Sequence, residues 1–170
     1  MTVFGIGYNN SANHLGGVVP CRSQLVARGK HNMAKRVLVV DDAMIMRMRI
    51  KEIAREAGWE IAGEATNGEE AILRFCELRP DLTTLDIVMP KMDGVSALRR
   101  IKQEDPTARI AMVSAVDQRE KLTECIHLGV LDFIVKPFDR ARLLSFFEKY
   151  RQGPSAASSP PAQDGSTDKE

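Results

Sequence analysis

Short apolar runs, each followed by a pattern typical of an amphipathic helix, alternate five times between Lys35 and Lys149. The runs Val37–Val40 and Ile110–Val113 are apolar throughout, which is typical of parallel strands buried on both faces. Parallel strands need crossover connections, and a helix after each strand supplies one. The sequence therefore predicts an α/β fold, a doubly wound five-stranded parallel sheet with five helices covering both of its faces.

Capping residues and helix breakers mark the ends of the predicted helices. We expect Gly58 to end the first helix and Pro80 to stop the second. Asn67, Asp117 and Asp139 stand where the second, fourth and fifth helices need an N-terminal cap. The predicted strands are, in chain order, residues 37–40, 59–62, 82–85, 110–113 and 131–135.

The predicted sheet occupies only part of this chain of 170 residues, a length that suits one domain with its own core. Residues 1–34 mix Gly, Asn, Ser and His without a period, and we expect a poorly ordered extension there. Residues 151–170 are rich in Gln, Gly, Pro, Ser and Ala, which is typical of a disordered tail. We therefore expect a single domain at residues 35–150 with no output domain after it.

Composition excludes several classes of function. The formal net charge of +1 indicates no basic face dedicated to nucleic acid. No apolar run is long enough to cross a membrane, and the first residues do not resemble a signal peptide. The three cysteines are widely spaced, which favours reduced thiols over a disulfide framework or a zinc site. We expect a cytoplasmic protein that inserts into no membrane and binds no nucleic acid.

Polar side chains follow four of the five predicted strands. Since the carboxyl ends of parallel strands share one edge of a sheet, these groups should lie close together although they are far apart in sequence. Asp86 ends the third strand, just before Met89-Pro90 and a glycine-containing turn. The predicted site residues are Asp41, Asp42, Asp86, Ser114 and Lys136.

These residue types suit phosphoryl transfer to a carboxylate. Neighbouring carboxylates repel one another unless a cation is present, and ligands that are all oxygen favour Mg²⁺. Lys136 offers a positive charge and Ser114 a hydroxyl donor to a phosphate oxygen. Taken alone, Asp41-Asp42 is more simply explained as a strand end followed by a helix cap, but the convergence of the other groups favours a metal site.

The strings V-L-V-V-D-D, T-L-D-I-V-M-P-K-M-D-G, V-S-A and D-F-I-V-K-P-F resemble those of two-component response-regulator receiver domains. The resemblance extends from about Lys35 to Tyr150. With no output domain expected, the chain is similar to the single-domain, CheY-like chemotaxis regulators, which have a flavodoxin-like fold. The resemblance implies a switch that takes a phosphoryl group from a sensor histidine kinase and catalyses only its own phosphorylation and dephosphorylation.

The same resemblance implies the ligand set of a Mg²⁺ site. Asp86 would be the phosphoacceptor. Asp42 would bind the metal directly and Asp41 would bind it through water, while Asp86 and the backbone carbonyl of Val88 would complete the protein ligands.

The resemblance also implies how the signal leaves the site. Ser114 matches the hydroxyl residue that follows the phosphoryl group, and Phe133 matches an aromatic switch residue. The Lys136-Pro137 bond would be cis, as is common in the family. A downstream protein target would bind the face formed by the fourth helix, fifth strand and fifth helix.

Val88 and Val116 are apolar where the family commonly has polar residues, two positions after Asp86 and two after Ser114. Both are expected to flank the path of water to the phosphoryl group. Our hypothesis is that they slow the hydrolysis of the aspartyl phosphate.

Four other functions compete with this interpretation. A phosphorelay intermediate would pass the group on to a histidine phosphotransfer protein, and the sequence does not separate this from a chemotaxis role. An aspartyl phosphatase typically needs a second acid where Val88 stands. A flavin or nucleotide binder would need a glycine-rich loop after the first strand, where Asp41-Asp42 stand instead. A DNA-binding regulator would need a helix-turn-helix after Tyr150.

Overall fold

A computed structural model describes residues 34–115 and 119–152 of the chain. In this part, strands and helices alternate as predicted. The strands are β1 (Arg36–Val40), β2 (Glu60–Ala65), β3 (Leu82–Asp86), β4 (Ile110–Ala115) and β5 (Asp132–Lys136). The helices are α1 (Met44–Glu56), α2 (Gly68–Leu78), α3 (Gly94–Glu104), α4 (Arg119–His127) and α5 (Arg140–Arg151). Most of the predicted N-terminal extension and C-terminal tail lies outside the described residues.

The five strands form one parallel sheet in the order β2-β1-β3-β4-β5. The chain therefore turns to one side of β1 to form β2 and then to the other side to form β3. The strand order reverses between β1 and β3, and open α/β sheets bind their ligands beyond the carboxyl ends of the strands at such a point. The predicted doubly wound sheet is confirmed, and the fold has the flavodoxin-like strand order.

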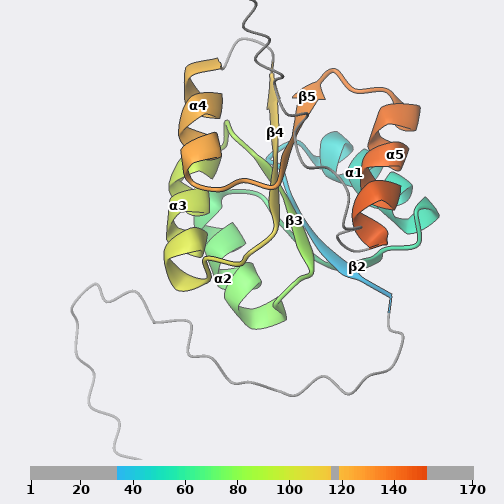
Figure 1. Cartoon of the computed structure of the whole chain (residues 1–170), viewed down its shortest axis with the longest axis horizontal. Helices are drawn as coiled ribbons and strands as arrows, with labels where there is room; N and C mark the ends of the chain where they lie inside the picture. Colours follow the sequence, from blue (N-terminus) through green and yellow to red (C-terminus); the bar gives the residue numbers. More distant parts are fainter. Residues whose placement is uncertain (1–33, 116–118, 153–170) are drawn as a thin grey trace, which may run out of the picture.

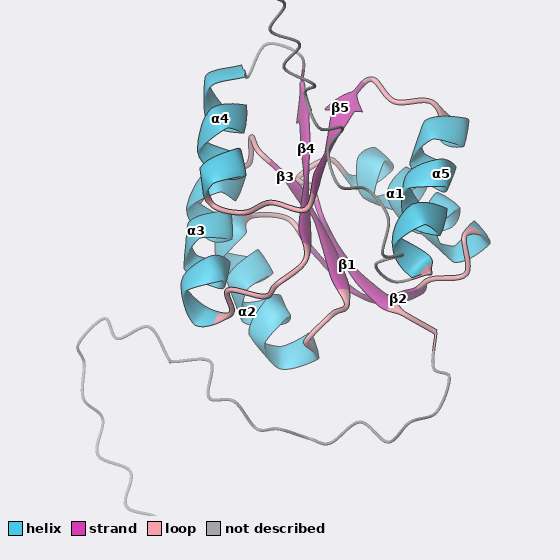
Figure 2. Ribbon diagram, in the orientation of Figure 1, coloured by secondary structure: helices cyan, strands magenta, loops and turns pink. Residues whose placement is uncertain are grey.

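Helices cover both faces of the sheet. Helices α2, α3 and α4 lie on one side, and α1 and α5 lie on the other (Figures 1 and 2). Leu38 and Val40 of β1 belong to the core beneath the first group, and Val37 and Val39 belong to the core beneath the second. The continuous apolar run of β1 thus supplies both cores, and each fully buried side chain of this size contributes about 1.5–3 kcal/mol.

Side-chain caps start three of the helices. Asn67 and Asp139 cap α2 and α5 as predicted, each accepting a hydrogen bond from the backbone N–H three residues further on. Asp93 caps α3 in the same way, a cap that was not predicted from the sequence. Gly58 follows α1 with φ of 80°, a left-handed conformation suited to glycine at a helix end. The predicted cap Asp117 lies outside the described residues.

The predicted bounds of the second strand are wrong. β2 begins one residue later than predicted and extends to Ala65. Trp59 lies in the turn before it, where the buried indole donates a hydrogen bond to the carbonyl of Phe147 on α5, 2.9 Å away. As β2 is an edge strand, polar residues such as Glu64 are tolerated in it, and the apolar pattern therefore ends before the strand does.

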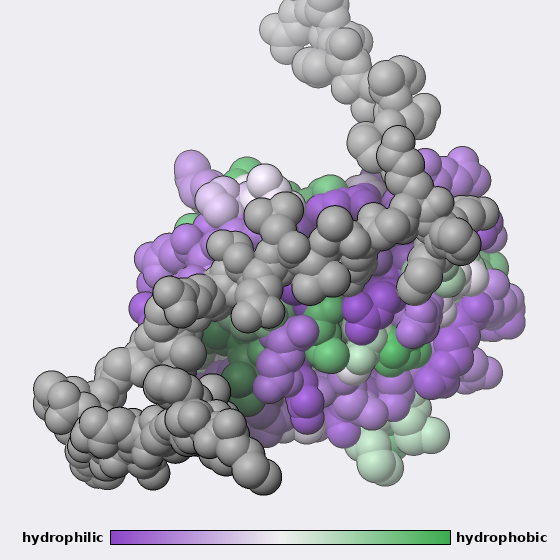
Figure 3. Space-filling view, turned by 90° about the horizontal axis from the view of Figure 1, so that it is seen from below, coloured by the Kyte–Doolittle hydropathy of each residue, from purple (hydrophilic) through white to green (hydrophobic). Residues whose placement is uncertain are grey.

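Seen from below, the visible described surface is mainly hydrophilic, with smaller hydrophobic areas among the polar side chains (Figure 3). Within residues 34–115 and 119–152, no helix is both long and apolar enough to span a lipid bilayer.

Two of the three cysteines, Cys76 and Cys125, fall in the described residues, and Cys125 is a free thiol. Cys125 is fully buried, and burial raises the pKa of its thiol to about 11. Cys21 lies outside the described residues.

Candidate functional site

Asp86 is the last residue of β3, which lies between β1 and β4 in the sheet. Its neighbours on β1 are set by the strand register. Val40 pairs with Leu85, so Asp41 and Asp86 are the next residues along two adjacent parallel strands. Although Asp86 ends a strand, the residue is only 6% exposed.

The turn after β3 brings the backbone close to Asp86. The Gly94 N–H donates to the carbonyl of Ile87 at 2.9 Å. A Cβ added at Gly94 would lie 1.9 Å from the carbonyl oxygen of Asp86. Only glycine therefore allows α3 to start so close to the strand end that carries Asp86.

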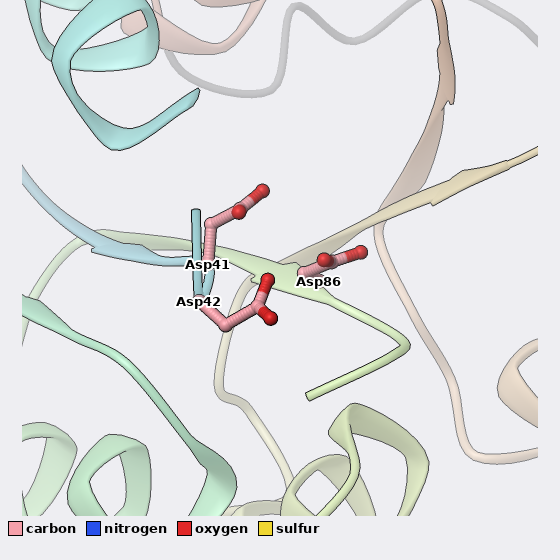
Figure 4. A group of neighbouring side chains, drawn as sticks. All are labelled: Asp41, Asp42 and Asp86. Carbon is pink, nitrogen blue, oxygen red and sulfur yellow. The ribbon is translucent and has the colours of Figure 1, made fainter. Parts of the chain in front are cut away.

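The three aspartates predicted as ligands form a cluster. Asp41, Asp42 and Asp86 each place one carboxylate oxygen within 4.8 Å of the others. Figure 4 shows these side chains at the ends of two adjacent strands, with the carboxylates of Asp42 and Asp86 pointing into the same space. Asp41 and Asp86 are buried, whereas Asp42 is exposed to solvent. The cluster is thus open on the side of Asp42.

Lys136 reaches this cluster from β5, on the far side of β4. Its Nζ atom lies 2.8 Å from Oδ2 of Asp41 and 3.0 Å from Oδ2 of Asp86. In the described part of the chain, Lys136 is the one cation paired with these three carboxylates. The cluster therefore keeps an excess of negative charge when all three acids are ionised.

The pKa values of Asp86 and Lys136 are both raised. Burial raises the pKa of Asp86; the hydrogen bond and charge of Lys136 oppose that effect, and the Asp41 charge adds to it. Burial alone would lower the pKa of Lys136, but its bonds to Asp41 and Asp86 outweigh burial and raise it. The two shifts agree physically, because one ammonium is shared between two buried carboxylates and each receives only part of its charge.

The residues present fit Mg²⁺. The donors are all oxygens, with no histidine or cysteine among them, and the excess negative charge would be offset by a divalent cation. Asp41 uses Oδ1 to accept from the Ala43 N–H at 2.9 Å and Oδ2 to accept from Lys136. This suits a carboxylate that contacts a metal through water better than one that binds it directly. The ligand role of the Val88 carbonyl stays a prediction.

The structure places the remaining predicted residues near the same edge. Ser114 is buried near the end of β4, and its hydroxyl donates to the carbonyl of Ala115 at 3.3 Å. Phe133 of β5 is half-buried and packs against the core beneath α2, α3 and α4. The Lys136-Pro137 bond is cis, as the resemblance implied. The switch roles of Ser114 and Phe133 stay predictions, and Val116 lies outside the described residues.

One side chain that contacts the acidic loop was not predicted from the sequence. Arg47 of α1 donates from Nη1 to the backbone carbonyls of Asp41 at 2.9 Å and Asp42 at 3.0 Å. Its Nε donates to Glu64 of β2 at 3.0 Å. An arginine inside an amphipathic helix is normally explained as part of the solvated face, so the sequence carries no signal that this one turns back to the loop.

Comparison with protein families shows which family this chain belongs to. The model of the response regulator receiver domain matches residues 37–148. The chain belongs to this family. The resemblance predicted from its motifs is therefore confirmed.

Curated relatives of this receiver domain include chemotaxis proteins. The chemotaxis protein CheY of Thermotoga maritima is 50% identical over 117 residues, which cover 69% of this chain and 98% of that protein. The chemotaxis protein CheY of Bacillus subtilis matches with the same identity and coverage. The receiver domain is thus similar to CheY proteins over nearly their whole length.

Solved structures agree with the family assignment. The CheX-CheY-BeF3-Mg²⁺ complex of Borrelia burgdorferi contains a chain that superposes with a TM-score of 0.63 at 38% identity, covering 65% of this chain and 84% of that chain. The response regulator domain of Thermotoga maritima CheB gives a TM-score of 0.63 at 36% identity and covers 71% of this chain and 96% of that chain. The first of these structures contains Mg²⁺.

Proposed function

We propose that this receiver domain is a CheY-like response regulator that accepts a phosphoryl group on Asp86 in a Mg²⁺-dependent reaction and signals in chemotaxis. One observation carries the proposal. The buried Asp86 carboxylate lies in a cluster with two other carboxylates, 3.0 Å from the ammonium of Lys136. A nucleophile, a metal-binding oxygen set and a fixed cation are the groups that phosphoryl transfer requires.

Asp86 supplies the nucleophile. A carboxylate oxygen of Asp86 attacks the phosphorus of a phosphohistidine on a sensor histidine kinase. The oxygen–phosphorus bond forms as the phosphorus–nitrogen bond breaks, and the imidazole leaves with the bonding electron pair. Burial disfavours the charged carboxylate and raises the pKa of Asp86, while the hydrogen bond and charge of Lys136 favour the ionised form that attacks.

The other residues of the site supply positive charge and position the phosphoryl group and the metal. Lys136 is placed to pair with a phosphoryl oxygen, because its Nζ atom already contacts the acceptor carboxylate. Asp41, Asp42, Asp86 and the Val88 carbonyl would hold Mg²⁺, which supplies positive charge to the phosphoryl oxygens when bound. The similarity to a CheY chain crystallised with Mg²⁺ supports this ligand choice.

The output of the switch is a change in binding. The phosphoryl group carries about two negative charges where the ionised Asp86 carboxylate carried one, which draws Lys136 and the Ser114 hydroxyl toward the phosphoryl group. Phe133 lines a hollow of about 230 Å³ between β5 and α5, together with Arg142 and Phe146. Phe133 belongs to β5, so a change in its position would alter the face formed by α4, β5 and α5, where a target protein would read the state of the site.

The role in chemotaxis rests on relatives named as chemotaxis proteins that match this chain at 50% identity. They favour a chemotaxis regulator over a phosphorelay intermediate. The domain catalyses only its own phosphorylation and dephosphorylation, and it works in the cytoplasm, where a sensor kinase presents its phosphohistidine.

Labelling tests the proposal. The purified chain should be labelled by a phosphohistidine donor or by acetyl phosphate with Mg²⁺, and EDTA should prevent labelling. Asp86→Ala should abolish it. Asp139→Ala, which removes the cap of α5, is the matched control and should still be labelled. Labelling that survives in folded Asp86→Ala would overturn the assignment.

A further inference from the structure

Arg47 lies in the second turn of α1, and its side chain is only 12% exposed. It points back to the loop between β1 and α1, the loop that carries Asp41 and Asp42. Both aspartates have a role in the proposed phosphoryl transfer, whereas Arg47 has none.

A single guanidinium nitrogen fixes the backbone of this loop. Nη1 of Arg47 carries two N–H groups, and it donates to the carbonyl of Asp41 at 2.9 Å and to that of Asp42 at 3.0 Å. Ala43, the N-cap of α1, supplies no side-chain hydrogen bond. The loop therefore depends on bonds from elsewhere, and Arg47 supplies two of them.

The guanidinium is itself held on its other side. Its Nε donates to Oε2 of Glu64 on β2 at 3.0 Å, and Lys51 donates to Oε1 of the same carboxylate at 2.9 Å. The hydrogen bond from Lys51 lowers the pKa of Glu64, with burial opposing it and the bond from Arg47 adding to it. Glu64 is thus a charged anchor that keeps the Arg47 side chain turned toward the loop.

From these contacts we propose that Arg47 is a positioning residue for the acidic cluster, fixing the Asp41-Asp42 backbone so that their carboxylates are preorganised for Mg²⁺. The proposal rests on the Mg²⁺ site of the proposed function. Groups that orient metal ligands without touching the metal commonly change metal affinity by about 10–100-fold when they are removed.

The charge of Arg47 makes the two possible effects of its removal differ in sign. A positive charge near a cation site weakens cation binding, so loss of the charge alone would tighten Mg²⁺ binding. Loss of positioning would weaken it, because the carboxylates must then be ordered by the metal itself. The direction of the change therefore separates a positioning role from a purely electrostatic one.

Mg²⁺ affinity, measured by titration calorimetry on the full chain, is the deciding readout. Arg47→Ala should raise the Kd for Mg²⁺ by about tenfold if the loop is positioned by this side chain. Arg47→Lys keeps the charge but cannot donate in the same planar arrangement, so it should restore only part of the affinity. Arg49→Ala is the matched control, since Arg49 is exposed on the same helix, and it should change the Kd by less than about twofold because solvent screens its charge.

Glu64 provides a second test of the same contact. Glu64→Gln should weaken Mg²⁺ binding in the wild-type background and have no further effect in the Arg47→Ala background, because Glu64 acts through Arg47. Urea unfolding of each variant shows that the measured Kd belongs to folded protein. A merely structural role of Arg47 would lower the stability and leave the Kd unchanged.

An unchanged or lower Kd in folded Arg47→Ala and Arg47→Lys overturns the positioning role, as does a wild-type chain that binds no Mg²⁺. The proposed function fails by a different result. Labelling of Asp86→Ala would overturn the acceptor assignment alone, since the Mg²⁺ titration requires no phosphoryl transfer.

Discussion

Lys136 on β5 lies 3.0 Å from Asp86 on β3, with β4 between the two strands. The same ammonium lies 2.8 Å from Asp41, the residue that follows β1. Lys136 thus links three strands at the edge where the site forms, but it shares its charge between two buried carboxylates. A site built in this way is incompletely neutralised without a metal, and this has consequences for stability as well as for chemistry.

Asp86→Asn should stabilise the metal-free protein at neutral pH. The folded-state pKa of Asp86 is raised above the ordinary value of an aspartate, mainly by burial. Stability tied to the protonated form is therefore fully present below the unfolded pKa and is lost as pH rises through the folded pKa. An uncharged asparagine avoids that loss.

Urea unfolding in EDTA between pH 4 and pH 7 checks this expectation. The advantage of Asp86→Asn should grow as pH rises, and saturating Mg²⁺ should reduce it by stabilising the wild type. A wild-type protein that is the more stable of the two at neutral pH in EDTA would contradict the pKa argument.

Gly94→Ala should destabilise the protein by about 3 kcal/mol or more, since the new Cβ cannot be accommodated by a side-chain movement. It would lie 1.9 Å from the carbonyl oxygen of Asp86, which is backbone. The end of β3 must move, so labelling by acetyl phosphate should also slow in whatever fraction stays folded.

Gly63→Ala is the control for Gly94→Ala. Its Cβ would lie 2.7 Å from Cδ1 of Leu78, the tip of a flexible side chain that can rotate away. We expect a loss of about 1 kcal/mol and normal labelling. Equal losses of stability in the two variants would show that the close approach at Gly94 does not matter.

Thr84→Val should raise the free energy of unfolding by about 1 kcal/mol. Thr84 is fully buried in β3, and within the described residues its Oγ1 makes no hydrogen bond. Valine has nearly the same shape without the hydroxyl that must lose its water on folding. Thr84→Ala also removes the hydroxyl but leaves a cavity, so it should show no gain. Chemical denaturation of both variants measures the difference.

The elements of the site that were predicted from sequence all depend on the position of strand ends. Asp41, Asp86 and Lys136 are predicted to lie together because parallel strands share a carboxyl edge, a rule that needs only the parallel direction of the strands and no side-chain detail. Arg47 could not be placed in this way. Its role depends on which way a long side chain turns and on the position of Glu64 in a neighbouring strand, and these are fixed by tertiary contacts.

The same distinction applies to the fold. Buried strands such as β1 were located from their continuous apolar runs, because both of their faces meet a core. The edge strand β2 was located poorly, because solvent along one side relaxes the demand for apolar residues. Trp59 is a further cause of the wrong strand bounds. Its apolar side chain is buried against α5, but it lies in the turn before β2 and not in the strand.

Val88→Asn should shorten the lifetime of the aspartyl phosphate. Val88 lies two residues after Asp86 and is 52% exposed, and we expect it to border the route by which water reaches Asp86. A valine side chain forms no hydrogen bond to an attacking water, whereas an asparagine amide can bind and orient one. The protein is labelled with acetyl phosphate, freed of donor, and followed as the label is lost with Mg²⁺ present. Val88→Ile is the matched control and should decay like the wild type, since it keeps an apolar side chain in the same place. If Val88→Asn loses its label no faster than wild type, the apolar side chain at this position does not set the slow hydrolysis that the sequence predicts.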